Sequence, residues 1–240
     1  MLLARVLWGS AEAAVTLGLV VLLLVVHQLW WTNREARAGA ERQVHALEEE
    51  WGRAPGADTE PSPPPEEGAS SAPEQGAGHA DGRSAPPRRD QAYAVIRIPR
   101  IGVTAPIAQG IGKSGVLNRG YVGHYPGTAQ PGREGNFALA GHRNTHGEPF
   151  RYINRLRPGD VVRVDTREGR FTYRIAKTLP QTSAADGSVI DAVPRSSVRR
   201  GYGFDERGSY ITLTTCTPEY TSRYRLVVWG RLERAEARGS

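Results

Sequence analysis

Hydrophobic positions form one long apolar block near the amino terminus and a series of short alternating runs after residue 91. The block, residues 13–33, carries no formal charge and is long enough to span a bilayer as a helix. Trp30 and Trp31 lie where an interfacial aromatic belt occurs. The alternative is a signal peptide cleaved after the small residues at 36–38. The apolar core is longer than such peptides carry, so the pattern favours a retained anchor.

Two segments of different composition follow the apolar block. Residues 34–52 are rich in helix formers with mixed charges, which predicts a short juxtamembrane helix. Residues 53–91 are dominated by Pro, Gly, Ala, Ser and Glu, and such a segment buries too little apolar surface to offset its ordering entropy. It is predicted to be a disordered stalk. Residues 1–90 are therefore expected to add nothing to the core of the domain that follows.

The runs after residue 91 alternate between apolar and polar positions and are rich in β-branched residues, which indicates β-strands. A turn of sequence REG between two of them predicts a hairpin. A helical stretch is expected only within 147–160, where Phe150, Ile153 and Leu156 recur at helical spacing. Many short strands with little helix predict an all-β barrel or sandwich. The main predicted strands are 92–99, 136–140, 160–166, 170–179, 209–216 and 224–232.

Charge changes this picture little. The net charge is +6, but no run combines basic residues with aromatic side chains that could stack on bases, so nucleic-acid binding is not expected. An anionic envelope polymer or lipid headgroups explain the basic excess as well. Residues 110–115 fit a glycine-rich nucleotide motif, but the Gly-, Asn- and Pro-rich sequence after them cannot form the required helix. We interpret them as a turn.

The orientation of the anchor is ambiguous from charge alone. Arg5 precedes the apolar block, whereas Arg34, Arg37 and Arg42 follow it, and the positive-inside rule would place the domain in the cytoplasm. The stalk and the chemistry described next favour the opposite side. We expect a single-pass protein with its domain outside the cell.

Cys216 is the only cysteine, and it ends a predicted strand. A lone cysteine is most often a small buried hydrophobe. A nucleophilic cysteine needs a base or cationic partner and a group that stabilises an oxyanion. His142 ends another predicted strand, and Arg223 and Arg225 open the strand after the cysteine, on one face by alternation. These residues could meet at one mouth of a barrel.

The segments that carry these residues resemble the sortases, the membrane-anchored cysteine transpeptidases of Gram-positive bacteria. The similarity covers TLTTC at 212–216, RLVVWG at 225–230, LAGHRNTHG at 139–147 and IRIPRIGVTAPI at 96–107. HYPGT at 124–128 and AGHRNTHGEPF are most similar to class E sortases of actinobacteria. The resemblance implies a closed sortase-type β-barrel of about eight strands.

The resemblance also implies residue roles. Cys216 would be the nucleophile, His142 the general acid and base, and Arg225, rather than Arg223, the group that binds substrate backbone and oxyanion. Tyr125 and Thr215 would contact substrate. His124 and His146 are expected to be structural.

The partners implied are secreted proteins with a C-terminal LAxTG- or LPxTG-like sorting signal and an amine of a peptidoglycan precursor. The signal would be cleaved between Thr and Gly. No cofactor is implied, and no residues show metal-ligand spacing.

Two alternatives remain open. An L,D-transpeptidase would need a Ser-His-Gly-Cys-like segment, which the sequence lacks. A non-catalytic, membrane-tethered barrel with a buried thiol is the other. The expected organisation is a cytoplasmic segment at 1–12, an anchor at 13–33, a juxtamembrane helix at 34–52, a linker at 53–91, a catalytic domain at 92–233 and a tail at 234–240.

Overall fold

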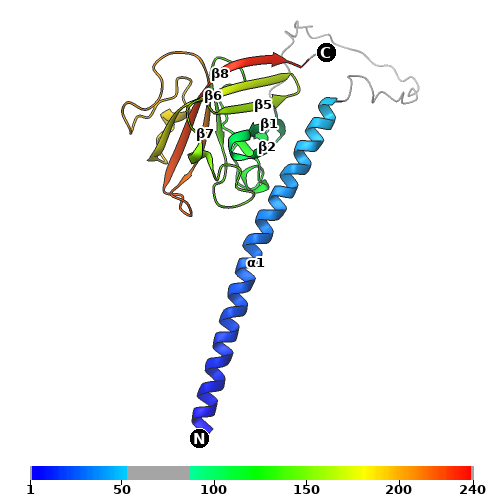
Figure 1. Cartoon of the computed structure of the whole chain (residues 1–240), viewed down its shortest axis with the longest axis vertical. Helices are drawn as coiled ribbons and strands as arrows, with labels where there is room; N and C mark the ends of the chain where they lie inside the picture. Colours follow the sequence, from blue (N-terminus) through cyan, green and yellow to red (C-terminus); the bar gives the residue numbers. More distant parts are fainter. Residues whose placement is uncertain (1, 53–86, 239–240) are drawn as a thin grey trace, which may run out of the picture.

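A long helix and a β-barrel make up the protein in the computed structural model, which describes residues 2–52 and 87–238 (Figure 1). Most of the expected stalk lies outside the described residues. The helix, α1 (Leu2–Gly52), runs without a break through both the predicted anchor and the predicted juxtamembrane helix. Within it, an 18-residue window of mean hydropathy 2.2 has no residue buried against the rest of the protein. By length and composition, this window is a candidate membrane span.

The barrel contains eight strands and is closed, as the sequence predicted. Neighbouring strands follow the order β1-β2-β3-β4-β7-β8-β6-β5, and β5 pairs with β1 to complete the ring. Most neighbours are antiparallel, but β2 pairs with β3 in parallel and β4 pairs with β7 in parallel. The strands are β1 (Ala92–Ile98), β2 (Val103–Gln109), β3 (Val122–His124), β4 (Gly135–Ala140), β5 (Val161–Thr166), β6 (Gly169–Ser183), β7 (Ser209–Thr217) and β8 (Tyr224–Ala237).

Alternation along β7 and β8 divides their side chains between two apolar clusters. Ile211, Leu213 and Val228 belong to the large cluster inside the barrel. Val227 and Trp229 belong to a smaller cluster that also contains residues of the β6–β7 connection. Because side chains of a strand point alternately to its two faces, the second cluster lies on the outer face of these strands.

Three local expectations can be compared with the structure. Residues 110–115 form a turn region, as predicted, and β5 and β6 form the predicted hairpin. The expected helix within 147–160 is wrong, because only a short 3-10 helix, η3 (Ile153–Arg155), forms there. Its spaced apolar residues instead fill the barrel core. β8 also continues to Ala237, beyond the expected boundary of the domain at residue 233.

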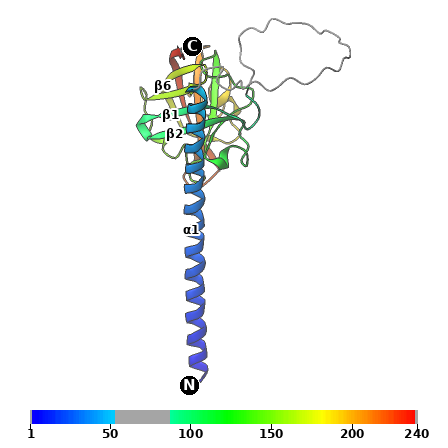
Figure 2. The same cartoon turned by 90° about the vertical axis from the view of Figure 1, so that its right-hand side faces the viewer.

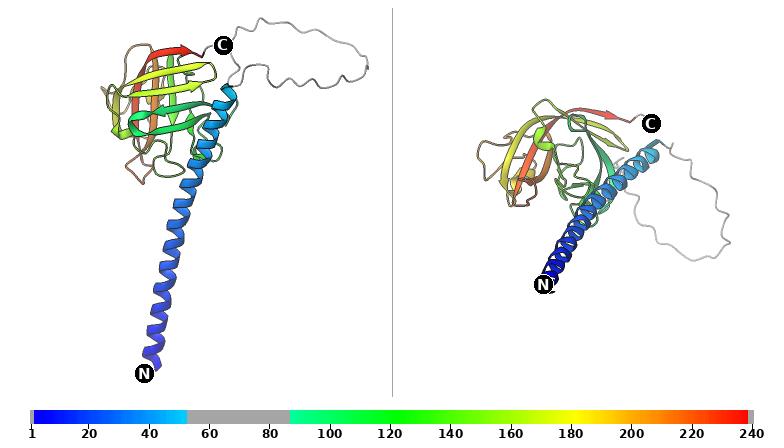
Figure 3. Two further views of the ribbon diagram at one scale, coloured as in Figure 1. Left: turned by 45° about the vertical axis from the view of Figure 1, so that its right-hand side comes forward. Right: turned by 60° about the horizontal axis from the view of Figure 1, so that its bottom comes forward.

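The C-terminal half of α1 packs against the barrel beside β1 and β2 (Figures 2 and 3). Its buried positions recur every three or four residues, which places them on one face of the helix. Glu48 pairs with Arg97 of β1. Residues of α1 thus join two small apolar clusters separate from the one inside the barrel, so this part of the chain packs on the domain without entering its core. The buried positions on α1 are Ala36, Ala40, Val44 and Leu47.

Glycine allows this close approach of helix and barrel. At Gly120, a side-chain Cβ would lie 2.8 Å from the carbonyl oxygen of Ala36. Gly120 also has φ 79°, a left-handed conformation that a side chain would strain. A larger residue at this position would push α1 away from the barrel.

Candidate active site

The β7–β8 pair places Cys216 directly opposite Arg225. In an antiparallel pair, the Cβ atoms of residues directly opposite each other lie roughly 4.5–5.5 Å apart, on the same face. By alternation this is the outer face, which also carries Val227 and Trp229. Both Cys216 and Arg225 are half-buried, and Cys216 is a free thiol. Hairpin register therefore sets the two side chains at directly opposed positions on one face.

Arg223 is placed differently from Arg225. It precedes the first residue of β8 and is exposed, and its guanidinium lies 5.2 Å from the ring centroid of Tyr224. Arg225 lies within the ladder, and its Nη1 donates hydrogen bonds to the carbonyl oxygens of Ser222 and Tyr224, at 2.9 and 3.0 Å. These bonds hold the guanidinium of Arg225 at the β7–β8 turn.

His142 lies two residues after β4, in a loop whose backbone is fixed to β7. The N–H of Gly141 donates to the carbonyl oxygen of Thr214, at 3.1 Å. Because β4 and β7 run parallel, their carboxyl ends lie at the same end of the barrel. His142 therefore follows β4, and Cys216 lies in the last residues of β7, at that same end of the barrel.

The environment of His142 keeps its ring neutral. Its Nε2 lies 2.9 Å from Oδ1 of Asn118, so Nε2–H donates and Nδ1 is left as the proton acceptor. Burial, together with the nearby charges of His146 and Lys113, lowers the pKa of His142 to about 4. His142 can therefore act as a base at neutral pH.

Arg143 connects the histidine loop to the end of the cysteine strand. Its Nη1 donates to the carbonyl oxygen of Cys216, at 3.1 Å, and to Oγ1 of Thr217, at 2.9 Å. Sequence reasoning overlooked both Arg143 and Asn118. The position of Arg143 beside His142 could have drawn attention to it, but nothing in the local sequence links Asn118 to a histidine so far along the chain.

Comparison with known proteins gives the family. The family model described as "Sortase domain" matches residues 96–233. Sortase SrtE1 of Streptomyces coelicolor is 44% identical over 237 residues, which cover 95% of this chain and 58% of that protein. Sortase SrtE2 of the same organism is 31% identical over 94% of this chain and 81% of its own length. The chain belongs to the sortase family.

The fold agrees with the sortase assignment. A crystal structure of Sortase E1 from Streptomyces coelicolor, with a tripeptide in the active site, superimposes with a TM-score of 0.58 and 51% identity. The match covers 62% of this chain and 91% of that one. Sortases are cysteine transpeptidases, and the most similar relatives place this chain in class E.

Two other expected site residues of the sortase lie on β7 or against it. Tyr125 follows β3, and its hydroxyl group lies 3.1 Å from Oγ1 of Thr214, which is two residues before Cys216 on the same face. Thr215 is 3% exposed, and its Oγ1 donates to the carbonyl oxygen of Gly141, at 2.8 Å. The burial of Thr215 favours a role in holding the histidine loop over a direct contact with substrate.

The two remaining histidines of the barrel differ from each other. His124 is fully buried, its Nδ1 lies 2.8 Å from the hydroxyl oxygen of Tyr93, and burial lowers its pKa to about 4. It is a structural residue. His146 instead stacks on His142, with ring centroids 5.3 Å apart. In the part of the chain that the structure describes, no group of three or more His, Cys, Asp or Glu side chains could hold a metal ion.

Proposed function

We propose that this sortase cleaves a C-terminal LAxTG- or LPxTG-like sorting signal between Thr and Gly and transfers the new acyl end to an amine of a peptidoglycan precursor. The observation that carries the proposal is the pairing of Cys216 with Arg225, at the barrel end where His142 follows a parallel strand. A thiol, a neutral imidazole and a fixed guanidinium are the groups that acyl transfer requires.

In the first half-reaction, Nδ1 of His142 accepts the thiol proton and the sulfur of Cys216 attacks the threonine carbonyl carbon. The Arg225 guanidinium stabilises the oxyanion that forms. The Thr–Gly C–N bond then breaks, His142 gives its proton to the leaving glycine amine, and a thioester remains on Cys216. An acceptor amine attacks the thioester, forms the new amide and releases the thiol, with the amine proton passing through His142.

Substrate choice is assigned to the neighbourhood of Tyr125. Its hydroxyl group lies beside Thr214 on the outer face of β7, and Thr214 is two residues before the nucleophile. There it would contact the second residue of the motif, two positions before the scissile threonine, and favour Ala over Pro at that position. The tripeptide in the active site of Sortase E1 supports a peptide substrate at the corresponding surface.

We also propose that α1 spans the cell membrane once, with the barrel outside; the apolar window of the helix supports the span. The arginines after the span opposed this orientation on charge count alone. Arg37, however, forms an ion pair with Glu148 of the barrel, at 3.0 Å, and Arg34 lies over the ring of Trp30. Arg37 thus has a structural partner in the barrel. Figure 1 shows the β7–β8 turn at the end of the barrel nearer the N-terminal half of α1, so the site would face the membrane.

The test is incubation of the protein with LAxTG and LPxTG peptides and an amine such as triglycine, followed by mass spectrometry. We expect cleavage after Thr, a transfer product, and a thioester mass on Cys216 when the amine is withheld. A non-catalytic barrel with a buried cysteine would produce none of these products and would resist alkylation by iodoacetamide.

A further inference from the structure

The loop after His142 has a backbone that costs free energy. His146, Gly147 and Glu148 have φ values of 52°, 83° and 55°, all in the left-handed region. Only glycine adopts this region readily, so the other two residues are strained there. Buried polar atoms Arg143 Nε, Asn144 Oδ1 and His146 Nδ1 also lack a hydrogen-bond partner among the described residues. Restraints from outside the loop are therefore needed to hold it.

Such restraints come from α1, at the last residue of the apolar block and one turn beyond it. Oδ1 of Asn33 accepts a hydrogen bond from the N–H of Gly147, at 2.7 Å. Nε of Arg37 donates to the carbonyl oxygen of Gly147, at 3.2 Å, and its Nη2 donates to Oε2 of Glu148, at 3.0 Å. Both polar groups of the Gly147 backbone are thus bound by two residues one helical turn apart.

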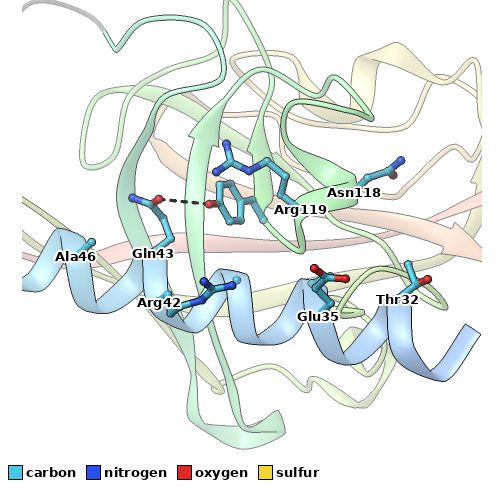
Figure 4. Close-up of a pocket in the computed structure, with 10 residues that line it drawn as sticks. Thr32, Glu35, Arg42, Gln43, Ala46, Asn118 and Arg119 are labelled. Atoms are coloured by element: carbon cyan, nitrogen blue, oxygen red, sulfur yellow. Dashed lines mark hydrogen bonds between the residues drawn. The ribbon is translucent and has the colours of Figure 1, made fainter. Parts of the chain in front are cut away.

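The same helix lies opposite the residue that fixes the His142 ring. A hollow of about 580 Å³ separates α1 from the short 3-10 helix η2 (Leu117–Arg119), and Asn118 lines it (Figure 4). On the helix side the hollow is lined by residues such as Glu35 and Arg42. Gln43 lies close to the hydroxyl group of Tyr121, at 3.3 Å. α1 therefore binds the residues that directly follow His146 and shares a hollow with Asn118, and His146 and Asn118 are the two residues in contact with the His142 ring.

We propose that the juxtamembrane part of α1 is a positioning element of the active site, in which Asn33 and Arg37 hold residues 146–148 so that His146 stays stacked on His142. This inference rests on the proposed role of His142 in catalysis. The membrane anchor then does more than tether the enzyme, because the docked helix sets the conformation of a catalytic loop. When the helix undocks, the left-handed residues relax and the stacked ring moves.

The test uses the full chain in detergent micelles, with Asn33→Leu and Arg37→Gln combined in one variant. Without the three bonds to the loop, we expect kcat to fall about ten-fold with KM within about two-fold, since a misplaced catalytic group loses rate rather than ground-state binding. Titration of the His142 ring by NMR is the second readout. The charged groups acting on His142 are His146 and Lys113. Loss of the His146 stack and greater exposure should raise the pKa of His142 toward its ordinary value.

Two controls separate positioning from general damage to the helix. Arg42→Gln removes the same charge from the same helix, and Arg42 donates only to the Ala38 carbonyl of its own helix among the described residues. It should leave kcat and the His142 titration unchanged. Asn33→Asp keeps the acceptor oxygen for Gly147 and should retain the wild-type kcat, unlike Asn33→Leu.

An unchanged kcat and an unchanged His142 titration in the combined variant would overturn the inference. If the combined variant loses the β-sheet signal in circular dichroism, Asn33→Leu and Arg37→Gln are tested separately. Their kcat values and His142 titrations then decide whether the inference holds. A wild-type protein that transfers no peptide would overturn the proposed function, while the titration difference would still test the contact between helix and loop.

Discussion

The β7–β8 hairpin and the histidine loop hold the groups proposed for catalysis at the same end of the barrel by different means. The hairpin joins Cys216 and Arg225 through continuous ladder pairing of two strands that are adjacent in sequence. The loop holds His142 through single bonds from distant segments: Asn118 on the ring, Arg143 to the end of β7, and α1 on the turn that follows. The first arrangement is local and redundant, and the second depends on a few long-range contacts.

This difference predicts where the enzyme is vulnerable. Altering one side chain in the hairpin removes a chemical group but leaves the pairing of the others intact. Altering a residue around the loop leaves every chemical group present but moves one of them. The predictions below separate these two kinds of damage.

The largest effect is expected from Cys216→Ala and His142→Ala. Each removes a group that forms or breaks bonds, and we expect transfer to fall by at least about a thousand-fold, with the barrel still folded. Turnover of a sorting peptide and far-ultraviolet circular dichroism should be measured on the same samples. Substantial transfer by Cys216→Ala would end the cysteine mechanism.

Arg225→Lys tests the fixed guanidinium of the hairpin. The planar fork that can meet an oxyanion is lost in lysine, and loss of such a donor costs roughly a hundred- to a thousand-fold in rate. Arg223→Lys is the matched control, because Arg223 is exposed and lies outside the ladder. We expect it to lose less than about ten-fold in kcat/KM on the same argument. The reverse ranking would assign the oxyanion to Arg223.

Asn118→Ala tests the loop by removing the acceptor for Nε2–H of His142. The ring then loses the bond that fixes its tautomer, and we expect kcat to fall about ten-fold with KM little changed. Asn118→Asp keeps the acceptor oxygen and should recover most of the rate. Equal loss in both variants would mean that the acceptor atom is not what matters.

The smallest effect concerns stability in acid. The pKa of His142 falls from 6.5 to about 4 on folding, so the unfolded chain binds a proton that the folded chain excludes. Stability from this group is complete above about pH 6.5 and is lost as the pH falls toward about 4. His124 contributes with the same sign. Thermal melting across this range should show a falling midpoint, with a shallower fall in His142→Gln; an unchanged slope in that variant would contradict the shift.

The contrast between local pairing in the hairpin and long-range contacts around the loop also explains what the sequence could predict. Alternation and turn residues were sufficient for the main strands, the all-β class and the β5–β6 hairpin, and they placed Cys216 and the two arginines on consecutive strands. The closed barrel and the choice of Arg225 came from the resemblance to sortases. The helix expected near Phe150 does not form, although its apolar residues recur at helical spacing. A loop and a short 3-10 helix carry these residues instead, and both bury them in the barrel core. The contacts of Asn118 and Arg143 are long-range and have no local pattern.

The docking of α1 on the barrel was only partly predictable, because it combines a local sequence pattern with a long-range contact. Ala36, Ala40, Val44 and Leu47 recur at helical spacing and could have indicated a packed face. Two of them are alanines, and charged residues surround them, so this apolar face is a weak signal in the sequence. Nothing in the helix sequence specifies its partner, because the surface it packs on forms only when the barrel closes.

The parallel pairing of β4 with β7 has a consequence for how the enzyme is made. Gly135 pairs with Ser209, so β4 emerges from the ribosome long before its partner exists. Non-local parallel pairing is slow to form, and the ring cannot close until β8 has joined β6 and β7. Cys216, the proposed nucleophile, is in the penultimate strand. A partly synthesised chain therefore has no working site, and a premature stop anywhere before β8 yields an open sheet edge rather than a weakened enzyme.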